Sequence, residues 1–137
     1  MVRFHKYAKM IQPRSLVKIV DNSGAKVCRV IKVLSQTPKT KVGDLAVVSL
    51  QKVRPRKIHK GKKGEGVKKG EIRLALLIHL KSFVDRKDGT SFKMNDNYGI
   101  LVTSKGKTLG TRFKLPLPKE LRTQKWIKVV SMASSFF

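Results

Sequence analysis

The stretch SLVKIVDNSGAKVCRVIKVL, residues 15–34, decides the fold. Residues 16–20 and 27–34 are two runs rich in Val, Ile and Leu, which are typical of β-strands. Residues 21–24, DNSG, separate the runs, and four consecutive turn formers interrupt any strand. The stretch therefore predicts two strands joined by a turn.

Further strand patterns follow along the chain. We predict strands at residues 45–53, 71–81 and 99–103, and a hairpin at 83–94 in which Asp88-Gly89 supplies the turn. Pro118 is suited to the first turn of a short helix through Leu121. The weak alternation of residues 126–132 suggests a last strand. Five or six short strands with no long helical period predict a mostly β fold, a small closed barrel in which closure removes exposed edges.

The strand at 71–81 shows the clearest alternation. One set of alternating residues is uniformly apolar, and we expect it to face the core: Ile72, Leu74, Leu76, Ile78 and Leu80. The other set is mixed, and we expect it to face solvent or a partner. His79 belongs to the mixed set and is predicted to be exposed or half-buried.

The charge balance indicates the kind of partner. The chain has 137 residues, the length of one domain, and is 40% hydrophobic and 29% charged, as globular proteins are. Its 32 Lys and Arg against eight Asp and Glu give a formal net charge of +24. Such a chain repels itself unless a polyanion neutralises it. Nucleic acid is the first candidate partner, and lipid headgroups come second.

The sequence offers no assembled catalytic or metal site. The lone Cys28 excludes a disulfide framework and a Cys-based zinc site, and it reads as a small hydrophobe inside a strand. The three histidines are scattered, and turn chemistry accounts for the aspartates beside Gly or Asn. We therefore expect no enzyme activity, cofactor, metal or small-molecule substrate. No apolar run is long enough to span a bilayer, and the cations do not fall on an amphipathic helix that could lie on a membrane, so no membrane role is expected.

Residues 54–70, RPRKIHKGKKGEGVKKG, form the strongest positive signal. Eight of these seventeen residues are Lys or Arg, four are Gly and one is acidic. The segment cannot bury itself, so we predict a projecting basic loop or ribbon. Lys and Arg on a Gly-rich backbone can follow a phosphate surface, and each neutralised phosphate releases counterions.

The aromatic residues do not form a stacking platform in the sequence. Phe83 and Phe92 flank the predicted hairpin and are expected in the core, and packing is also the better explanation of Trp126. This distribution favours recognition of the shape and backbone of folded RNA over the reading of bases.

Several motifs, in one order, resemble a known family. They are Asp21 to Ala25, Ile31 to Leu34, Val42 to Asp44, Val67 to Glu71, Ala75 to Ile78, Asp88-Gly89, Gly110 to Phe113, Glu120 to Thr123 and Lys128 to Ala133. Together they are similar to the universal large-subunit ribosomal protein family L-fourteen. Met94 stands where that family has an aromatic residue and Ile100 where it has Val, and a core tolerates both changes.

The resemblance implies a fold and a function. The fold would be a closed five-stranded barrel with a projecting basic β-ribbon and short C-terminal helices, spanning residues 10–137 as one domain. The protein would be a structural constituent of the large ribosomal subunit that binds large-subunit rRNA. It would contribute to an inter-subunit bridge with small-subunit rRNA during translation. It would contact the neighbouring ribosomal protein of family nineteen, and the ribosomal silencing factor would bind the same face.

Two sets of residues are assigned under the hypothesis of a ribosomal protein, the first from the basic character of the chain and the second from the resemblance. The expected rRNA contacts are Lys32, Lys52, Arg54, Arg56, Lys57, Lys68, Lys69, Arg86 and Arg122. The expected subunit-interface or silencing-factor surface comprises Thr111, Arg112 and Lys128.

Two departures from the family pattern bear on the compartment. Residues 1–9 form a basic N-terminal extension, and residues 60–66 lengthen the basic loop. Both additions favour a mitochondrial ribosome over a bacterial or plastid one. The alternatives to a ribosomal protein are a free single-strand-binding barrel, which would need exposed aromatics in a groove, and an enzyme on a basic scaffold.

Overall fold

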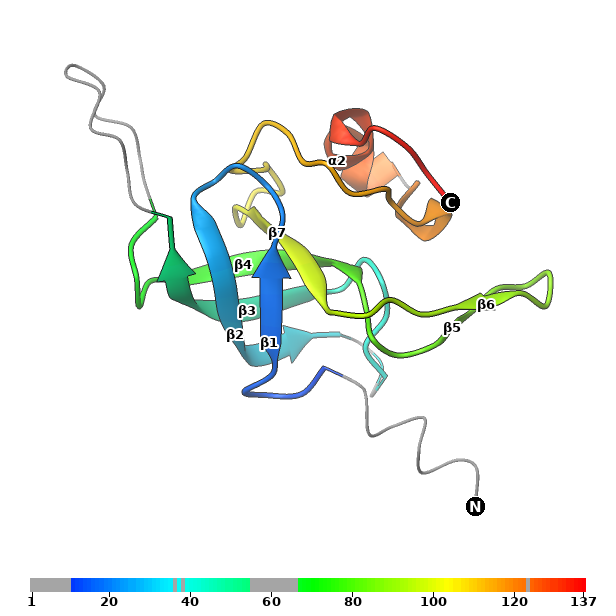
Figure 1. Cartoon of the computed structure of the whole chain (residues 1–137), viewed down its shortest axis with the longest axis horizontal. Helices are drawn as coiled ribbons and strands as arrows, with labels where there is room; N and C mark the ends of the chain where they lie inside the picture. Colours follow the sequence, from blue (N-terminus) through cyan, green and yellow to red (C-terminus); the bar gives the residue numbers. More distant parts are fainter. Residues whose placement is uncertain (1–10, 36, 38, 55–66, 123) are drawn as a thin grey trace.

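The computed structural model describes residues 11–35, 37, 39–54, 67–122 and 124–137. Within them a five-stranded closed barrel is the main body, as predicted, with the strands in the order β1-β2-β3-β4-β7 (Figure 1). Its strands are β1 (Leu16–Ile19), β2 (Ala25–Leu34), β3 (Leu45–Val53), β4 (Ile72–His79) and β7 (Tyr98–Val102).

The barrel closes between its first and last strands. β1 pairs in parallel with β7, with Lys18 opposite Tyr98, and the other neighbours in the barrel are antiparallel. The predicted hairpin at 83–94 also forms, as β5 (Val84–Asp85) and β6 (Ser91–Phe92), and it lies apart from the barrel as a two-stranded sheet. Each barrel strand therefore has two neighbours.

Neighbouring residues on β1 and β2 point to opposite sides of the barrel wall. Val17 and Cys28 point into the barrel and are fully buried, whereas Lys18 and Arg29 beside them are exposed. Burial raises the pKa of the Cys28 thiol to about 12, which keeps it protonated and supports its interpretation as a small hydrophobe. The same alternation that builds the core thus presents cations on the outer surface of these strands.

The prediction for β4 was wrong about which residues face the barrel interior. Ala75 and Leu77 lie in the barrel core, whereas Leu76 and Ile78 belong to a second core on the outside of the barrel. Ile72 is 63% exposed. The reason is tertiary, because the C-terminal segment covers the outer face of β4 and β7, so both faces of these strands are buried.

His79 was also predicted wrongly, since it is fully buried. Its Nε2 lies 2.7 Å from the Pro116 carbonyl oxygen, which can only accept, so Nε2 carries the proton. The ring lies edge-on to Tyr98 and Phe137, and Nδ1 is buried without a hydrogen-bond partner. Burial lowers the pKa of His79 below its usual value, since a charged imidazolium would lack solvation.

Protonation of His79 is expected to cost stability in mild acid. The unfolded chain takes up this proton first as the pH falls below about 6.5, so the free energy of unfolding is highest above that pH. We expect a loss of about 1 kcal/mol between pH 7.5 and 5.5. Urea unfolding at both pH values, on the wild type and on His79→Gln, measures it. The variant should show a flatter dependence, and an equal slope would contradict this assignment.

The C-terminal segment forms short helices, as the resemblance implied. They are η1 (Lys119–Leu121), η2 (Gln124–Trp126) and α2 (Ile127–Met132). The strand expected at 126–132 was therefore wrong. Trp126 and Val129 are three residues apart, share one helical face and pack into the second core with Leu76 and Ile78. No helix within the described residues is long and apolar enough to cross a membrane.

The two hairpin phenylalanines differ in environment. Phe92 lies edge-on to Phe137 at 5.1 Å between ring centroids, but it is only half-buried and belongs to neither of the two cores. Phe83 is 42% exposed, with the ammonium of Lys93 5.2 Å from its ring centroid. The core assignment of Phe83 was wrong because the hairpin lies apart from the barrel and leaves this ring uncovered.

Candidate nucleic-acid interface

A groove runs beside the turn between β1 and β2, and we call it the turn groove. Its floor is apolar and includes Ile19, Val20, Tyr98, Phe113 and Leu115. Its rim is cationic. The rim cations are Lys18, Lys26, Arg54, Arg112 and Lys114.

Hydrogen bonds from Asn22 hold the rim together. Its Oδ1 accepts from the backbone N–H of Thr111 at 2.7 Å, and its Nδ2 donates to the Thr111 hydroxyl at 2.8 Å. The DNSG turn is thereby tied to the GTRF segment, 89 residues further along the chain. This bonding brings Arg112 to the groove, so two of the motifs that carry the family resemblance build one rim.

Asp21 fixes the same turn to the barrel. The sequence predicted only a local role for it within the turn, but it also bonds to strand β7. Its side chain is only 2% exposed, and its Oδ2 accepts from the backbone N–H of Leu101 in β7 at 3.2 Å. Its Oδ1 accepts from the backbone and hydroxyl of Ser23. Burial raises the pKa of Asp21, although these bonds favour its charged form. The turn is thus fixed to the barrel wall.

A second hollow, the strand groove, lies over the outer surface of β1, β2 and β3. It shares Lys18 and Val27 with the turn groove, and Leu16 adds to its apolar floor. Its cations are Lys18, Arg29, Lys52, Lys69 and Lys81. Asp96 is its acid, 2.8 Å from the Lys18 ammonium and 3.8 Å from that of Lys81. The hydrogen bond from Lys18 lowers the pKa of Asp96 and raises that of Lys18, so both stay charged.

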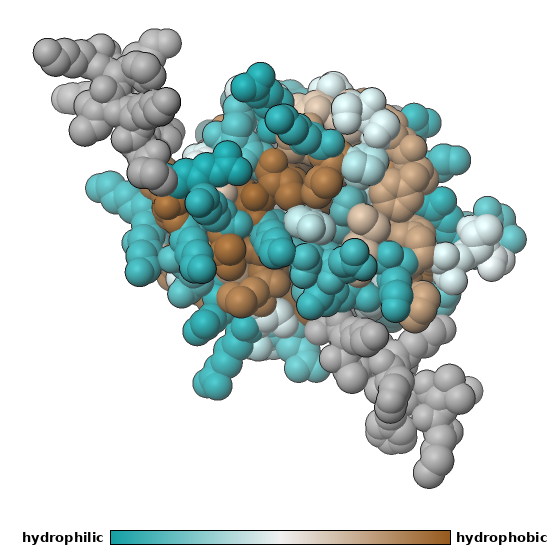
Figure 2. All heavy atoms as spheres, viewed as in Figure 1, coloured by the Kyte–Doolittle hydropathy of each residue, from teal (hydrophilic) through white to brown (hydrophobic). Residues whose placement is uncertain are grey.

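The two grooves together form what we call the β1–β2 face. Counting Lys18 once, nine cations line it, against Asp96 and the buried Asp21. Figure 2 shows apolar side chains gathered over β1 and β2, with hydrophilic side chains around them. A surface with this charge excess attracts a polyanion, and its apolar floor gives that partner more than phosphate contacts.

The predicted rRNA residues separate into groups. Lys52 and Lys69 line the strand groove and Arg54 lines the turn groove, so the fold brings these three to one face. Lys32 and Lys68 are exposed but line neither groove. Arg56 and Lys57, with most of the basic loop 54–70, lie outside the described residues. The N-terminal extension 1–9 does too.

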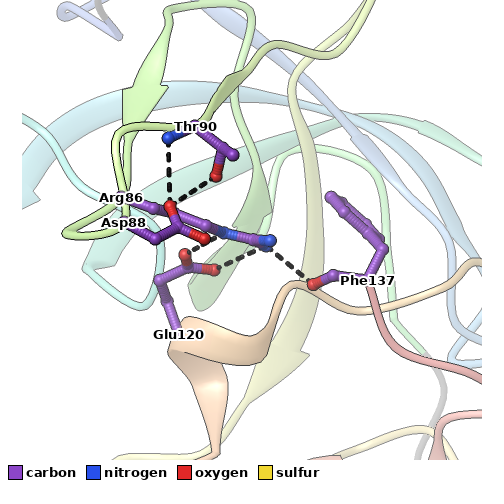
Figure 3. A network of polar contacts seen from close by, with 5 residues as sticks. All are labelled: Arg86, Asp88, Thr90, Glu120 and Phe137. Atoms are coloured by element: carbon purple, nitrogen blue, oxygen red, sulfur yellow. Dashed lines mark hydrogen bonds and ion pairs between the residues drawn. The ribbon is translucent and has the colours of Figure 1, made fainter.

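Arg86 is engaged within the protein (Figure 3). Its Nε donates to Glu120 at 2.8 Å, and one terminal nitrogen donates to the Phe137 carbonyl oxygen at 2.7 Å. Its guanidinium also lies over the Phe92 ring, 4.7 Å from the centroid. These contacts fasten the β5–β6 hairpin to η1 and to the C-terminal residues. The guanidinium of Arg122 lies over the Phe136 ring at 4.2 Å, and its side chain is exposed.

The predicted subunit-interface residues lie at two different hollows. Thr111 and Arg112 are exposed at the rim of the turn groove. Lys128 is exposed in a separate lysine pocket. That pocket has an apolar edge at Ile127, which is 61% exposed, and its cations are Lys105, Lys107, Lys125 and Lys128.

Sequence reasoning missed five cations of the β1–β2 face: Lys18, Lys26, Arg29, Lys81 and Lys114. Each is isolated, so no charge run marks it. A signal was present for Lys18 and Arg29, because both are single cations at the outward positions of apolar strands. The described residues contain no group of three or more His, Cys, Asp or Glu that could hold a metal.

Comparisons with known proteins agree with the family resemblance of the sequence motifs. The chain matches the family described as ribosomal protein L14p/L23e over residues 10–137. It is also similar to the large ribosomal subunit protein uL14 of Petrotoga mobilis. The two are 37% identical over 126 residues, which cover 90% of this chain and 97% of that protein.

Proposed function

Since the chain belongs to the ribosomal protein L14p/L23e family, we propose that its β1–β2 face is the surface that binds large-subunit rRNA. As a member of that family the protein is a structural, non-enzymatic constituent of the large ribosomal subunit, and it binds large-subunit rRNA. The observation that supports this face is the concentration of nine cations around two adjoining grooves.

The charges of this face are available to a partner. Among the nine cations of this face, only Lys18 and Lys81 form an ion pair within the described residues. Both pair with the same carboxylate, that of Asp96. Lys26, Arg54 and Lys114 are exposed around the turn groove. Phosphate groups would supply the missing counter-charges, and the release of condensed cations from RNA would favour binding.

A matched pair of triple variants tests the proposal. Lys26→Gln, Arg54→Gln and Lys114→Gln together should weaken binding to large-subunit rRNA and reduce the slope of log affinity against log salt by about 2 to 3. Filter binding over a salt series measures both quantities. Co-sedimentation with large subunits in sucrose gradients should show reduced incorporation of the tagged variant.

The control variant changes the same number of charges elsewhere. Lys41, Lys87 and Lys119 are exposed and line neither groove of the β1–β2 face, so their replacement with Gln lowers the net charge equally. This control should keep nearly the wild-type salt slope and incorporation. Equal losses in both triple variants would show that net charge, and not this face, determines binding.

The same proposal includes the residues that were predicted to contact the small subunit, a neighbouring protein or other parts of the rRNA. Thr111, Arg112 and Lys128 are proposed to contact small-subunit rRNA across the bridge, the family-nineteen protein or the ribosomal silencing factor. Their exposure at two cation-lined hollows supports a role in contacts outside the chain. Lys32, Lys68, Arg122 and the basic-loop residues Arg56 and Lys57 are proposed as additional rRNA contacts. Arg86 is not proposed as one, because its guanidinium is held by Glu120 and Phe137.

The compartment depends on other observations than the ribosomal role does. The relative in Petrotoga mobilis is bacterial, which points away from a mitochondrial protein. The mitochondrial assignment rested on residues 1–9 and 60–66, and both lie outside the described residues. It stays a prediction from those two additions.

A further inference from the structure

The β1–β2 face combines charge with an apolar floor. Leu16 is 53% exposed on β1, and Val27 lies at the junction of the two grooves. Tyr98 is half-buried in the turn groove. Simple attraction to a phosphate backbone requires no such floor, because Lys and Arg on a polar surface suffice for it.

We propose that this face binds a short unpaired segment of RNA, with its phosphates on the cationic rims and its bases or riboses against the apolar floor. The inference rests on the proposed function, because it specifies which kind of rRNA element the β1–β2 face takes. Unstacked bases can lie on apolar and aromatic side chains, whereas the bases of a duplex are buried in the stack.

The size and arrangement of the grooves fit successive nucleotides. The turn groove and the strand groove have volumes of about 680 and 560 Å³. Both lie within the range of roughly 300–1,000 Å³ that small-molecule sites have, so each has room for a nucleotide. They meet at Lys18 and Val27, which places a cation and an apolar side chain between two neighbouring hollows. A phosphate between two splayed nucleotides would meet Lys18 there.

A protein partner fits this face less well. Protein–protein interfaces are depleted in Lys, and their centres are depleted in charge generally. Here six lysines and three arginines surround the floor. Burying so many cations against a neutral protein would be costly. The partner therefore needs repeated negative charges, such as the phosphates of a nucleic-acid backbone.

The experiment compares single-stranded and duplex RNA on the full chain. A fluorescein-labelled, unstructured RNA of about ten nucleotides, and the same strand annealed to its complement, are titrated with the protein at about 0.15 M salt. Fluorescence anisotropy gives both dissociation constants. Charge density alone would favour the duplex, so tighter binding of the single strand, expected at about tenfold, would report base contacts with the floor.

A floor variant separates base contacts from charge. Leu16→Thr with Val27→Thr leaves the net charge unchanged and keeps two residues that favour strands. Neither Leu16 nor Val27 belongs to the two buried cores, so the fold should persist, as circular dichroism would verify. Single-strand affinity should fall about tenfold, and duplex affinity should stay the same. Leu16→Thr alone, at the more exposed site, should give part of the same loss.

Ile72→Thr is the matched control, because Ile72 is a comparably exposed strand residue that lines neither groove. It should leave both affinities unchanged. The inference is overturned if duplex binds at least as tightly as single strand, or if the floor variant matches Ile72→Thr. It is also overturned if poly-glutamate competes as well as RNA at equal charge. If any of these results came with normal incorporation into large subunits, only the preference for unpaired RNA would be refuted. The proposed rRNA-binding function would stand.

Discussion

Replacing Asp21 with Ala is expected to lower the free energy of unfolding by about 3–5 kcal/mol. The carboxylate is almost completely buried and accepts hydrogen bonds from the backbone of Leu101 and from the backbone and hydroxyl of Ser23. Alanine would leave these donors without partners inside the protein and would release the β1–β2 turn from β7. Urea unfolding followed by circular dichroism measures the difference.

Asp88 offers a matched control for Asp21. It accepts from the backbone N–H and the hydroxyl of Thr90, which repeats the bonding of Asp21 to Ser23. Asp88 is exposed, however, and has no described contact equivalent to Leu101. Asp88→Ala should therefore have a much smaller effect. Similar losses in the two variants would show that the local turn, and not the buried contact with β7, carries the stability.

Gly110→Ala is expected to cost about 2–3 kcal/mol for a steric reason. A Cβ atom at this position would lie 2.8 Å from Asp21 Cβ and 2.9 Å from Asn22 Oδ1. Neither neighbour can retreat freely, because Asp21 is bonded to β7 and Asn22 to Thr111. The methyl group would push the GTRF segment away from the turn. The free energy of unfolding, measured with urea, and the affinity for RNA should therefore both be lower in this variant.

Gly89→Ala separates steric crowding from backbone strain. Gly89 has nothing within 4 Å of the added Cβ, but its φ of +88° is a conformation that alanine adopts at a cost of about 1 kcal/mol. This variant should lose that amount of stability and keep wild-type RNA affinity. If Gly110→Ala were no more harmful than Gly89→Ala, the close contact between the turn and the GTRF segment would be refuted as a structural requirement.

Local chemistry was sufficient to predict the barrel. The runs on either side of the DNSG turn became β1 and β2, and Asp88-Gly89 became the hairpin turn. The faces of β4 could not be predicted from its alternation, because the C-terminal segment covers the outer face and buries residues of both alternating sets. His79 was misjudged for the same reason, since its burial depends on Pro116 and Phe137, which are distant in sequence.

The candidate site was predictable only where cations are consecutive or flank the basic loop. Lys52, Arg54 and Lys69 were found in this way, whereas Lys18 and Arg29 are single charges in apolar strands. The turn groove itself was beyond prediction, because its lining residues come from segments far apart in the sequence, such as the DNSG turn and residues 112–115. Arg86 shows the converse limit, since composition cannot tell a cation that holds the protein together from one that meets RNA.

The parallel pairing of β1 with β7 has a consequence for how the chain acquires its shape. Lys18 cannot pair with Tyr98 until the roughly eighty residues between them have been synthesised and have left the ribosome. Before that moment β1 and β4 each lack a neighbour, so the growing polypeptide presents two unpaired strand edges and a strongly cationic surface. Contacts of such long sequence separation form slowly. The barrel can therefore close only after β7 has been synthesised, and until then the open strand edges and the cations are exposed together.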